Sequence, residues 1–172
     1  IIENEVDFGL MGEGEQKKYD NCFLTEVILR EEMVFVMPKG HKFADRKSVS
    51  IYDIVEEKLV LPERLSASRR YIESEFQRND ISVKPYLEIG NIEFVKKLVE
   101  QNFGSNILSW ASVREEVAAH RICAARITGV SFERDVLLVK KREKTFFPAT
   151  TLFIDFLFDE VTRNKDQFVF TV

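Results

Sequence analysis

The sequence contains few of the residues that build metal and redox sites. Its 172 residues include two cysteines, Cys22 and Cys123, and two histidines, His41 and His120. The cysteines lie far apart, lack the C-x-x-C spacing and have no histidine nearby, which favours two reduced thiols over a metal site or redox pair. His41 is expected in a polar loop and His120 after a helix, where a histidine more often interacts with the helix dipole than takes part in catalysis. We therefore expect no metal and no cofactor.

Motifs that carry catalysis or nucleotide binding are also missing. The sequence has no G-x-S-x-G, H-E-x-x-H or P-loop motif and no glycine-rich dinucleotide fingerprint. Glu13, Glu15 and Asp20 lie close together, but nothing marks two of them as an acid/base pair, and an acidic surface is the simpler interpretation. The sequence therefore predicts a protein that is not an enzyme.

Positive charge and long apolar runs are scarce as well. The formal net charge is −4, and the basic clusters Lys17-Lys18, Arg69-Arg70 and Lys140-Lys141-Arg142 are short. A domain that grips duplex DNA usually has a basic face, so we expect these clusters to be solvated and this chain not to contact DNA itself. No apolar run approaches the roughly 20 residues of a membrane span, and no signal peptide is found. These absences predict a cytoplasmic protein with no membrane partner.

Short apolar segments alternate with helical patterns along the chain. Met33 to Met37 is a continuous apolar run before Pro38, which is typical of a strand buried on both faces. The alternation predicts an α/β fold with a mainly parallel sheet. The expected strands lie at 6–11, 23–29, 33–37, 59–61, 83–89, 107–108, 122–127 and 136–139. The expected helices lie at 51–57 with Ser50 as the cap, from 66, from 91 with Asn91 as the cap, at 111–119, and from 148.

Two turns in which a strand leads into a helix are candidate anion sites. They are Leu65-Ser66-Ala67-Ser68-Arg69 and Gly90-Asn91-Ile92-Glu93. The free N–H groups and the dipole at a helix start attract negative charge. In open α/β sheets, ligands bind beyond the carboxyl ends of strands. Ordinary helix capping is the alternative for both turns, and Arg69 has the further alternatives of facing solvent or pairing with Glu73.

The last expected helix is unusually apolar. We expect an inward face of Leu152, Phe153, Phe156, Leu157 and Val161, and further apolar residues extend beyond one stripe. Such a helix needs partners on two sides, which predicts self-association or cover from residues outside this sequence.

The order and spacing of these pieces resemble the effector-binding domain of LysR-type transcriptional regulators. The matching segments are NEVDFGLMG, EVILREEMVFVMPKGHKFA, SVSIYDIVEEKLVLPE, SASRRYIESEFQRNDI, LEIGNIEFVKKLVEQNFGSNILSWASVREEVAAHRI and FFPATTLFIDFL. The resemblance implies a two-lobed fold like that of type II periplasmic binding proteins, with two crossover strands and an effector in the cleft between the lobes. Residues 1–27 and 128–172 are then an incomplete first lobe, and 28–127 are the second.

The candidate ligand residues come from the two helix starts and, for the first lobe, from the resemblance. Gly12 and Glu13 form the first-lobe wall, and Ser66, Ala67, Ser68, Arg69, Asn91 and Ile92 lie at the second-lobe helix starts. Trp110 either flanks the cleft or packs in the core or hinge. The winged helix-turn-helix of the family and the first strand–helix–strand of lobe one are absent, and the chain begins at Ile1 rather than Met.

The resulting prediction is an effector-sensing domain that binds a small anionic ligand. The expected partners are a small-molecule effector and further copies of the protein, with DNA contacted only through the missing N-terminal domain. The alternative is a solute-binding protein of a transport system with the same fold, because a fold alone does not fix a function.

Overall fold

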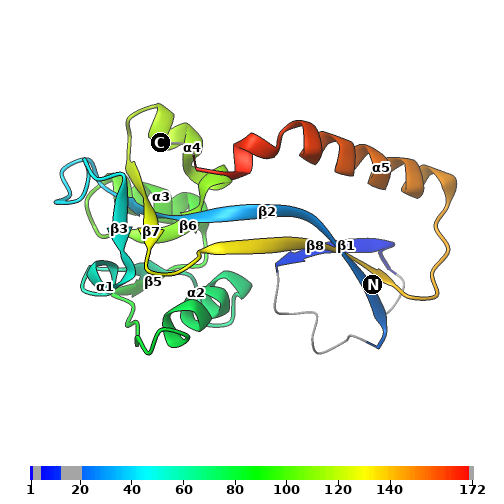
Figure 1. Cartoon of the computed structure of the whole chain (residues 1–172), viewed down its shortest axis with the longest axis horizontal. Coiled ribbons are helices and arrows are strands. Elements are labelled where there is room, and N and C mark those ends of the chain that lie inside the picture. The colour runs from blue at the N-terminus through cyan, green and yellow to red at the C-terminus, as the bar shows by residue number, and fades with distance from the viewer. Residues whose placement is uncertain (2–4, 13–20, 171–172) are drawn as a thin grey trace.

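The structure is a computed structural model that describes residues 1, 5–12 and 21–170. An arm extends from a rounded body (Figure 1). We define the body as residues 31–128 and the arm as residues 5–12, 21–30 and 133–153. The strands are β1 (Phe8–Gly12), β2 (Phe23–Met37), β3 (Ser48–Ser50), β4 (Val60–Leu61), β5 (Leu87–Glu88), β6 (Asn106–Ser109), β7 (Cys123–Thr128) and β8 (Glu133–Lys141). The helices are α1 (Ile51–Ile54), α2 (Ala67–Gln77), α3 (Ile92–Glu100), α4 (Trp110–Ala118), α5 (Pro148–Arg163) and the short 3-10 helix η2 (Lys165–Phe168).

The main sheet is mixed, with mostly antiparallel pairs. Its strand order is β1-β8-β2-β7-β3, and β6 also pairs with β2. All pairs of β2 and β8 are antiparallel, whereas β3–β7 and the separate β4–β5 pair are parallel. The prediction of a mainly parallel sheet is therefore wrong. The apolar run 33–37 is buried on both faces as expected, but a central antiparallel strand covered by helices on both sides produces the same pattern.

Two expected strands, 23–29 and 33–37, are one continuous strand. The charged residues Arg30, Glu31 and Glu32 lie in the middle of β2 rather than in a loop, and each pairs with a residue of β8. The register shifts between Val27 and Leu29, as at a β-bulge. Because β2 and β8 both run from the arm into the body, they join the two parts (Figure 1).

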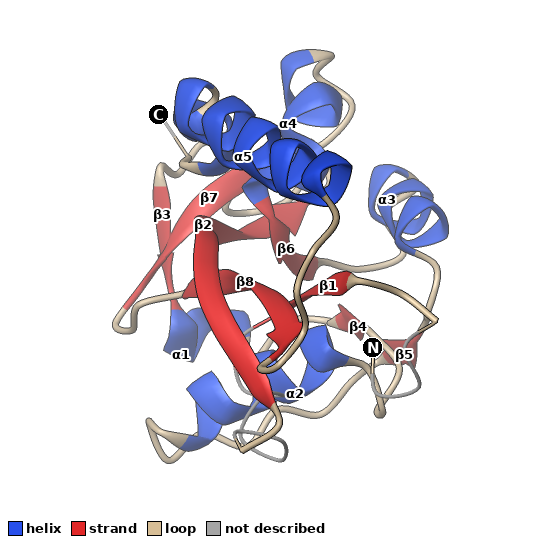
Figure 2. Ribbon diagram, turned by 90° about the vertical axis from the view of Figure 1, so that its right-hand side faces the viewer, coloured by secondary structure: helices blue, strands red, loops and turns tan. Residues whose placement is uncertain are grey.

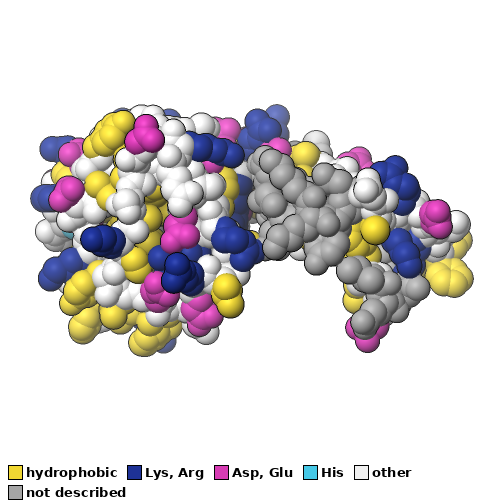
Figure 3. Space-filling view, turned by 90° about the horizontal axis from the view of Figure 1, so that it is seen from below, with side chains coloured by type: hydrophobic (Ala, Val, Ile, Leu, Met, Phe, Trp, Pro, Cys, Tyr) yellow, Lys and Arg dark blue, Asp and Glu magenta, His cyan; other side chains and the backbone are white. Residues whose placement is uncertain are grey.

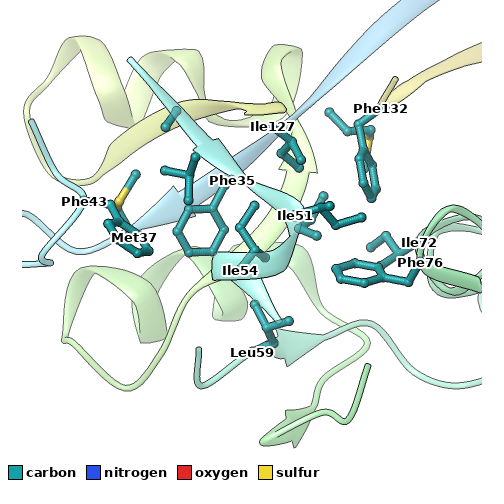
Figure 4. Packing of buried hydrophobic residues seen from close by; sticks show 14 of the residues in the cluster. Phe35, Met37, Phe43, Ile51, Ile54, Leu59, Ile72, Phe76, Ile127 and Phe132 are labelled. Carbon is teal, nitrogen blue, oxygen red and sulfur yellow. The ribbon is translucent and has the colours of Figure 1, made fainter. Parts of the chain in front are cut away.

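The inner half of β2 organises the core of the body. Met33, Phe35 and Met37 face one side and belong to a cluster with residues of α1 and α2, and Figure 4 shows Phe35 beside Ile54. The intervening valines face the other side with residues of α3 and α4. Figure 2 shows the same layers, with α1 and α2 on one side of the strands and α3, α4 and α5 on the other.

The capped helix starts agree with the sequence analysis. The side chains of Ser50, Ser66 and Asn91 each accept a backbone N–H from the first turn that follows. The expected strand 83–89 is wrong in length, because only Leu87–Glu88 pairs. Pro85 has no N–H to contribute to a strand ladder, which accounts for the shorter strand.

The arm is thinner than the body, as the space-filling view shows (Figure 3). In it, Phe8 of β1 packs against Phe146 and Phe153 at ring distances of 6.5 and 6.0 Å. Helix α5 starts at Pro148 as predicted, but it has no fully buried residue. The inward positions expected for Leu152, Phe153 and Phe156 are wrong, since these side chains are 69%, 53% and 58% exposed. Three strands of the arm provide too little surface to cover an apolar helix.

No helix among the described residues is long and apolar enough to cross a membrane.

Phe76 tests the core of the body. It is fully buried on α2 and stacks edge-on with Phe132 at 6.0 Å. Phe76→Ala is expected to lower the free energy of unfolding by about 3–5 kcal/mol, because it deletes a buried ring and leaves a cavity. Urea unfolding measures the change. The control is Phe94→Ala on α3, where the ring is exposed. Equal effects of the two changes would contradict the assignment of the core.

Candidate functional site

A pocket of about 150 Å³ lies where the starts of α2 and α3 meet β2, β6 and β8. Three of the residues predicted from the sequence, Ser66, Ser68 and Ile92, line it together. The chain reaches this arrangement because β4 and β5, each followed by a capped helix, lie side by side in parallel. The full lining is Met33, Pro62, Ser66, Ser68, Ile89, Gly90, Ile92, Val95, Asn106, Ile107, Leu108, Ser109 and Arg134.

The two serines at the start of α2 have different tasks. Ser66 is the helix cap, and its Oγ accepts the backbone N–H of Arg69 at 3.1 Å. Ser68 follows two residues later, and its Oγ accepts a hydrogen bond from Nη1 of Arg134 at 3.0 Å. In both cases the serine oxygen is the acceptor, so each hydroxyl keeps its own hydrogen for another partner. The capping alternative therefore describes Ser66, but it does not describe Ser68.

Arg69 takes the alternative position that the sequence left open. Its side chain is 3% exposed, and Nε donates to Glu73 Oε1 at 2.8 Å. Nη1 donates to the carbonyl of Pro62 at 3.0 Å and lies 3.4 Å from Glu88 Oε1. Through these contacts, Arg69 joins α2 to the ends of β4 and β5. Its side chain is not part of the pocket lining.

The other predicted residues surround the pocket at different distances. Asn91 caps α3 by accepting the N–H of Phe94 at 2.9 Å and is not in the lining, nor is Ala67. Gly12 ends β1, and a Cβ there would lie 3.9 Å from Nη1 of Arg134. This brings the end of an arm strand close to the pocket. Glu13 lies outside the described residues.

Arg134 is the charged residue that sequence reasoning missed. It stands on β8 directly opposite Glu31 of β2, and the two side chains form an ion pair. Both side chains are largely buried, at 17% and 9% exposure. The strand predicted from the sequence begins at Val136, whereas β8 begins at Glu133, so Arg134 lay outside the predicted strand. Opposite charges face each other at Arg30–Asp135 and Glu31–Arg134, which is a usable signal only when the strand register is known.

Asn106 supplies a second polar group that the sequence analysis did not identify. It is fully buried in β6, and its Oδ1 accepts the N–H of Ile107. Its Nδ2 has no hydrogen-bond partner, although it is buried in the pocket wall. Buried polar groups in folded proteins are nearly always paired with a protein group or a water molecule, so this donor is an unfilled hydrogen-bonding position at the pocket wall.

The polar groups at the pocket are mainly donors. Arg134 with its guanidinium, Asn106 with its unpaired Nδ2, and Ser66 and Ser68 with their hydroxyls all belong to the lining. Glu31 lies behind Arg134 and is not in the lining. Such a site suits the oxygens of a small acid. Among the described residues, no group of histidine, cysteine and acidic side chains has the arrangement of a metal site.

Trp110 and His41 have packing roles. Trp110 starts α4 next to Ser109, but its ring packs at 4.8 Å against Phe170 on the other side of the sheet from α2. His41 packs between Phe35 and Phe43, and its Nε2 lies 3.1 Å from Glu57 Oε2. Of the two alternatives for Trp110, the structure therefore shows packing rather than a cleft wall.

The model of one protein family, the LysR substrate binding domain, matches residues 1–162. This chain belongs to the LysR substrate-binding domain family. The family is one of transcriptional regulators rather than enzymes. The solute-binding alternative loses its support, because the relatives found are regulators.

Among the relatives are three curated regulators. The RuBisCO operon transcriptional regulator of Allochromatium vinosum is 25% identical over 95% of this chain and 53% of its own length. The HTH-type transcriptional regulator CysL of Bacillus subtilis is 28% identical over 76% of this chain and 42% of its own. CbbR of Xanthobacter flavus is 30% identical over 77% of this chain and 40% of its own length. The chain thus spans about half the length of the curated relatives it matches.

Solved LysR regulatory domains share the mixed α/β fold. The regulatory domain of CcmR from Synechocystis PCC6803, in complex with 2-PG, superposes with a TM-score of 0.80 at 21% identity, covering 92% of this chain and 75% of that one. The effector-binding domain of QuiR, in complex with shikimate, superposes with a TM-score of 0.80 at 18% identity, covering 94% of this chain and 75% of that one.

The ion pair between Glu31 and Arg134 can be tested without a ligand. Arg134→Gln is expected to lower the free energy of unfolding by about 3 kcal/mol, because it leaves the Glu31 carboxylate buried without its cation. The double change with Glu31→Gln is expected to recover much of that loss. Urea unfolding of both single variants and the double variant measures the coupling. Strictly additive losses would contradict a buried ion pair at the pocket.

Proposed function

We propose that this domain senses a small anionic effector in the pocket at the start of α2 and thereby controls DNA binding by a helix-turn-helix domain of the full-length regulator. The observation that carries the proposal is the unpaired Nδ2 of Asn106, buried in a wall that also presents Arg134 and Ser68. An acid placed there satisfies the amide and receives charge-assisted hydrogen bonds. The complexes of CcmR with 2-PG and of QuiR with shikimate support a small-molecule ligand.

In this proposal the pocket is part of an inter-lobe cleft. The second lobe is residues 28–127, the incomplete first lobe is 1–27 and 128–172, and β2 and β8 are the two crossover strands. Three features support it: the two long strands run from arm to body, the β2 register shifts between Val27 and Leu29, and Gly12 approaches Arg134. A ligand that contacts both sides favours one angle between them, which is how binding shifts a conformational population.

Regulation requires that the attached DNA-binding domain respond to this angle. The coupling is a difference in effector affinity between two arrangements of the regulator, and DNA changes effector affinity reciprocally. Self-association, expected from the apolar last helix, stays a prediction and accords with the exposed side chains of Leu152, Phe153 and Phe156.

Ser68 separates ligand binding from helix capping. Calorimetric titration with small acids, beginning with shikimate and inorganic phosphate, identifies one that binds. Ser68→Ala is then expected to weaken it about tenfold, since a hydrogen bond to a charged group contributes roughly 1.5–3 kcal/mol. The melting temperature of the free protein should fall only by the loss of the hydrogen bond from Arg134, because the cap of α2 is Ser66.

Two variants control this experiment. Ser74→Ala removes a hydroxyl from the same helix outside the pocket, where Oγ donates to the carbonyl of Tyr71. It should leave affinity unchanged. Arg69→Ala should lower stability through its lost contacts with Glu73 and Pro62. Unchanged affinity in Ser68→Ala with a lowered melting temperature would contradict the proposal and make Ser68 structural only.

A further inference from the structure

The end of the chain connects the arm to the body by a route separate from β2 and β8. At its start, α5 is attached to the arm, where Thr150 Oγ1 donates to Asp7 Oδ2 at 3.2 Å and Phe153 packs on Phe8. A hydrogen bond from Lys144 keeps the pKa of the Asp7 carboxyl below its ordinary value. From α5 the chain continues through η2 to Phe170, which lies on the body beside α4 (Figure 1). We call residues 164–170 the C-terminal strap.

One ion pair on the body holds both backbone groups of the last described residue. The N–H of Phe170 donates to Glu32 Oε2 at 3.0 Å, and its carbonyl accepts from Arg126 Nη2 at 2.6 Å. Glu32 and Arg126 are themselves paired at 2.7 Å. The hydrogen bond to Glu32 raises the pKa of Arg126 above its ordinary value. Recognition of a backbone N–H and C=O together is how a protein binds an extended peptide segment.

The ring of Phe170 is part of the core of the body. It is 5% exposed, packs edge-on against Trp110 at 4.8 Å and belongs to the cluster that contains Val34 and Val36. Trp110 is the first residue of α4, directly after Ser109 of the pocket wall. The strap therefore packs against the start of α4, next to the pocket wall.

Undocking the strap leaves no charge without a partner. Glu32 and Arg126 are bonded directly to each other, so undocking need not break their contact. Its cost is exposure of the Phe170 ring and of the Trp110 face that it covers, together with the loss of two hydrogen bonds. A contact that can open without stranding a buried charge suits a switch. The family model ends at residue 162, so the strap lies outside the matched region.

We propose that the C-terminal strap is a releasable third connection between arm and body, with Glu32, Trp110 and Arg126 as its docking site. While docked, it restricts the angle between arm and body and fixes the start of α4 beside the pocket. This inference goes beyond the proposed function, because it concerns an intramolecular contact and requires no ligand.

The single tryptophan of the chain reports directly on docking. Phe170→Ala, and a variant that ends after Arg163, are expected to shift Trp110 emission to the red and to raise its quenching by acrylamide. A peptide with the sequence of residues 163–172 should reverse both changes in the truncated variant. Val169→Ala, a neighbouring change at an exposed side chain, is the control and should behave as the original protein.

Small-angle scattering of the same variants tests the connection. Release is expected to broaden the distribution of interatomic distances, while circular dichroism shows that the variants are folded. Unchanged Trp110 emission and quenching in the truncated variant would overturn the docking. A changed Trp110 signal with an unchanged scattering profile would overturn the third connection, because the strap would then dock without restricting the arm.

Discussion

The structure depends on one strand, β2, which carries two neighbouring buried carboxylates at the junction of arm and body. Glu31 and Glu32 are 7% and 8% exposed, and they point to opposite faces because side chains alternate along a strand. Each needs a cation, since a buried carboxylate without a partner is strongly destabilising. Glu31 takes Arg134 from β8, and Glu32 takes Arg126 from β7. Both ion pairs therefore join β2 to neighbouring strands where the arm begins.

The two faces of this junction have different uses. On one face, Arg134 extends from its ion pair to Ser68 and into a pocket that presents donors to a ligand. On the other face, Arg126 and Glu32 bind the backbone of the strap. The inner half of β2 is buried on both sides, whereas the outer half enters the thin arm. Under the two proposals, a change in angle between arm and body is sensed on both faces of this single strand.

Much of the local structure could be predicted from the sequence, because it depends on neighbouring residues. Ser50, Ser66 and Asn91 cap helices through contacts only two or three residues away. The apolar run 33–37 is a buried strand, and Ser66, Ser68 and Ile92 meet at one pocket. The resemblance of ordered segments added the family, which periodicity alone does not provide.

Features that require the strand register could not be predicted. The predicted parallel direction of the strands was wrong, because burial on both faces does not distinguish parallel from antiparallel neighbours. Arg134 meets Glu31 across 103 positions of sequence, and Arg126 meets Phe170 across 44. Arg69 looked like a ligand residue, but its buried contacts lie with Glu73 and Pro62.

In the proposed site, an acid completes the hydrogen bonding of the pocket at Asn106. The most direct measurement is a nitrogen–proton NMR titration that follows the side-chain amide of Asn106, assigned by its loss in an Asn106 variant, as a binding acid is added. The proposed site predicts a large, saturable shift of that amide together with the side-chain signal of Arg134, both at the affinity measured by calorimetry. Saturable binding that leaves the Asn106 amide unmoved would contradict it.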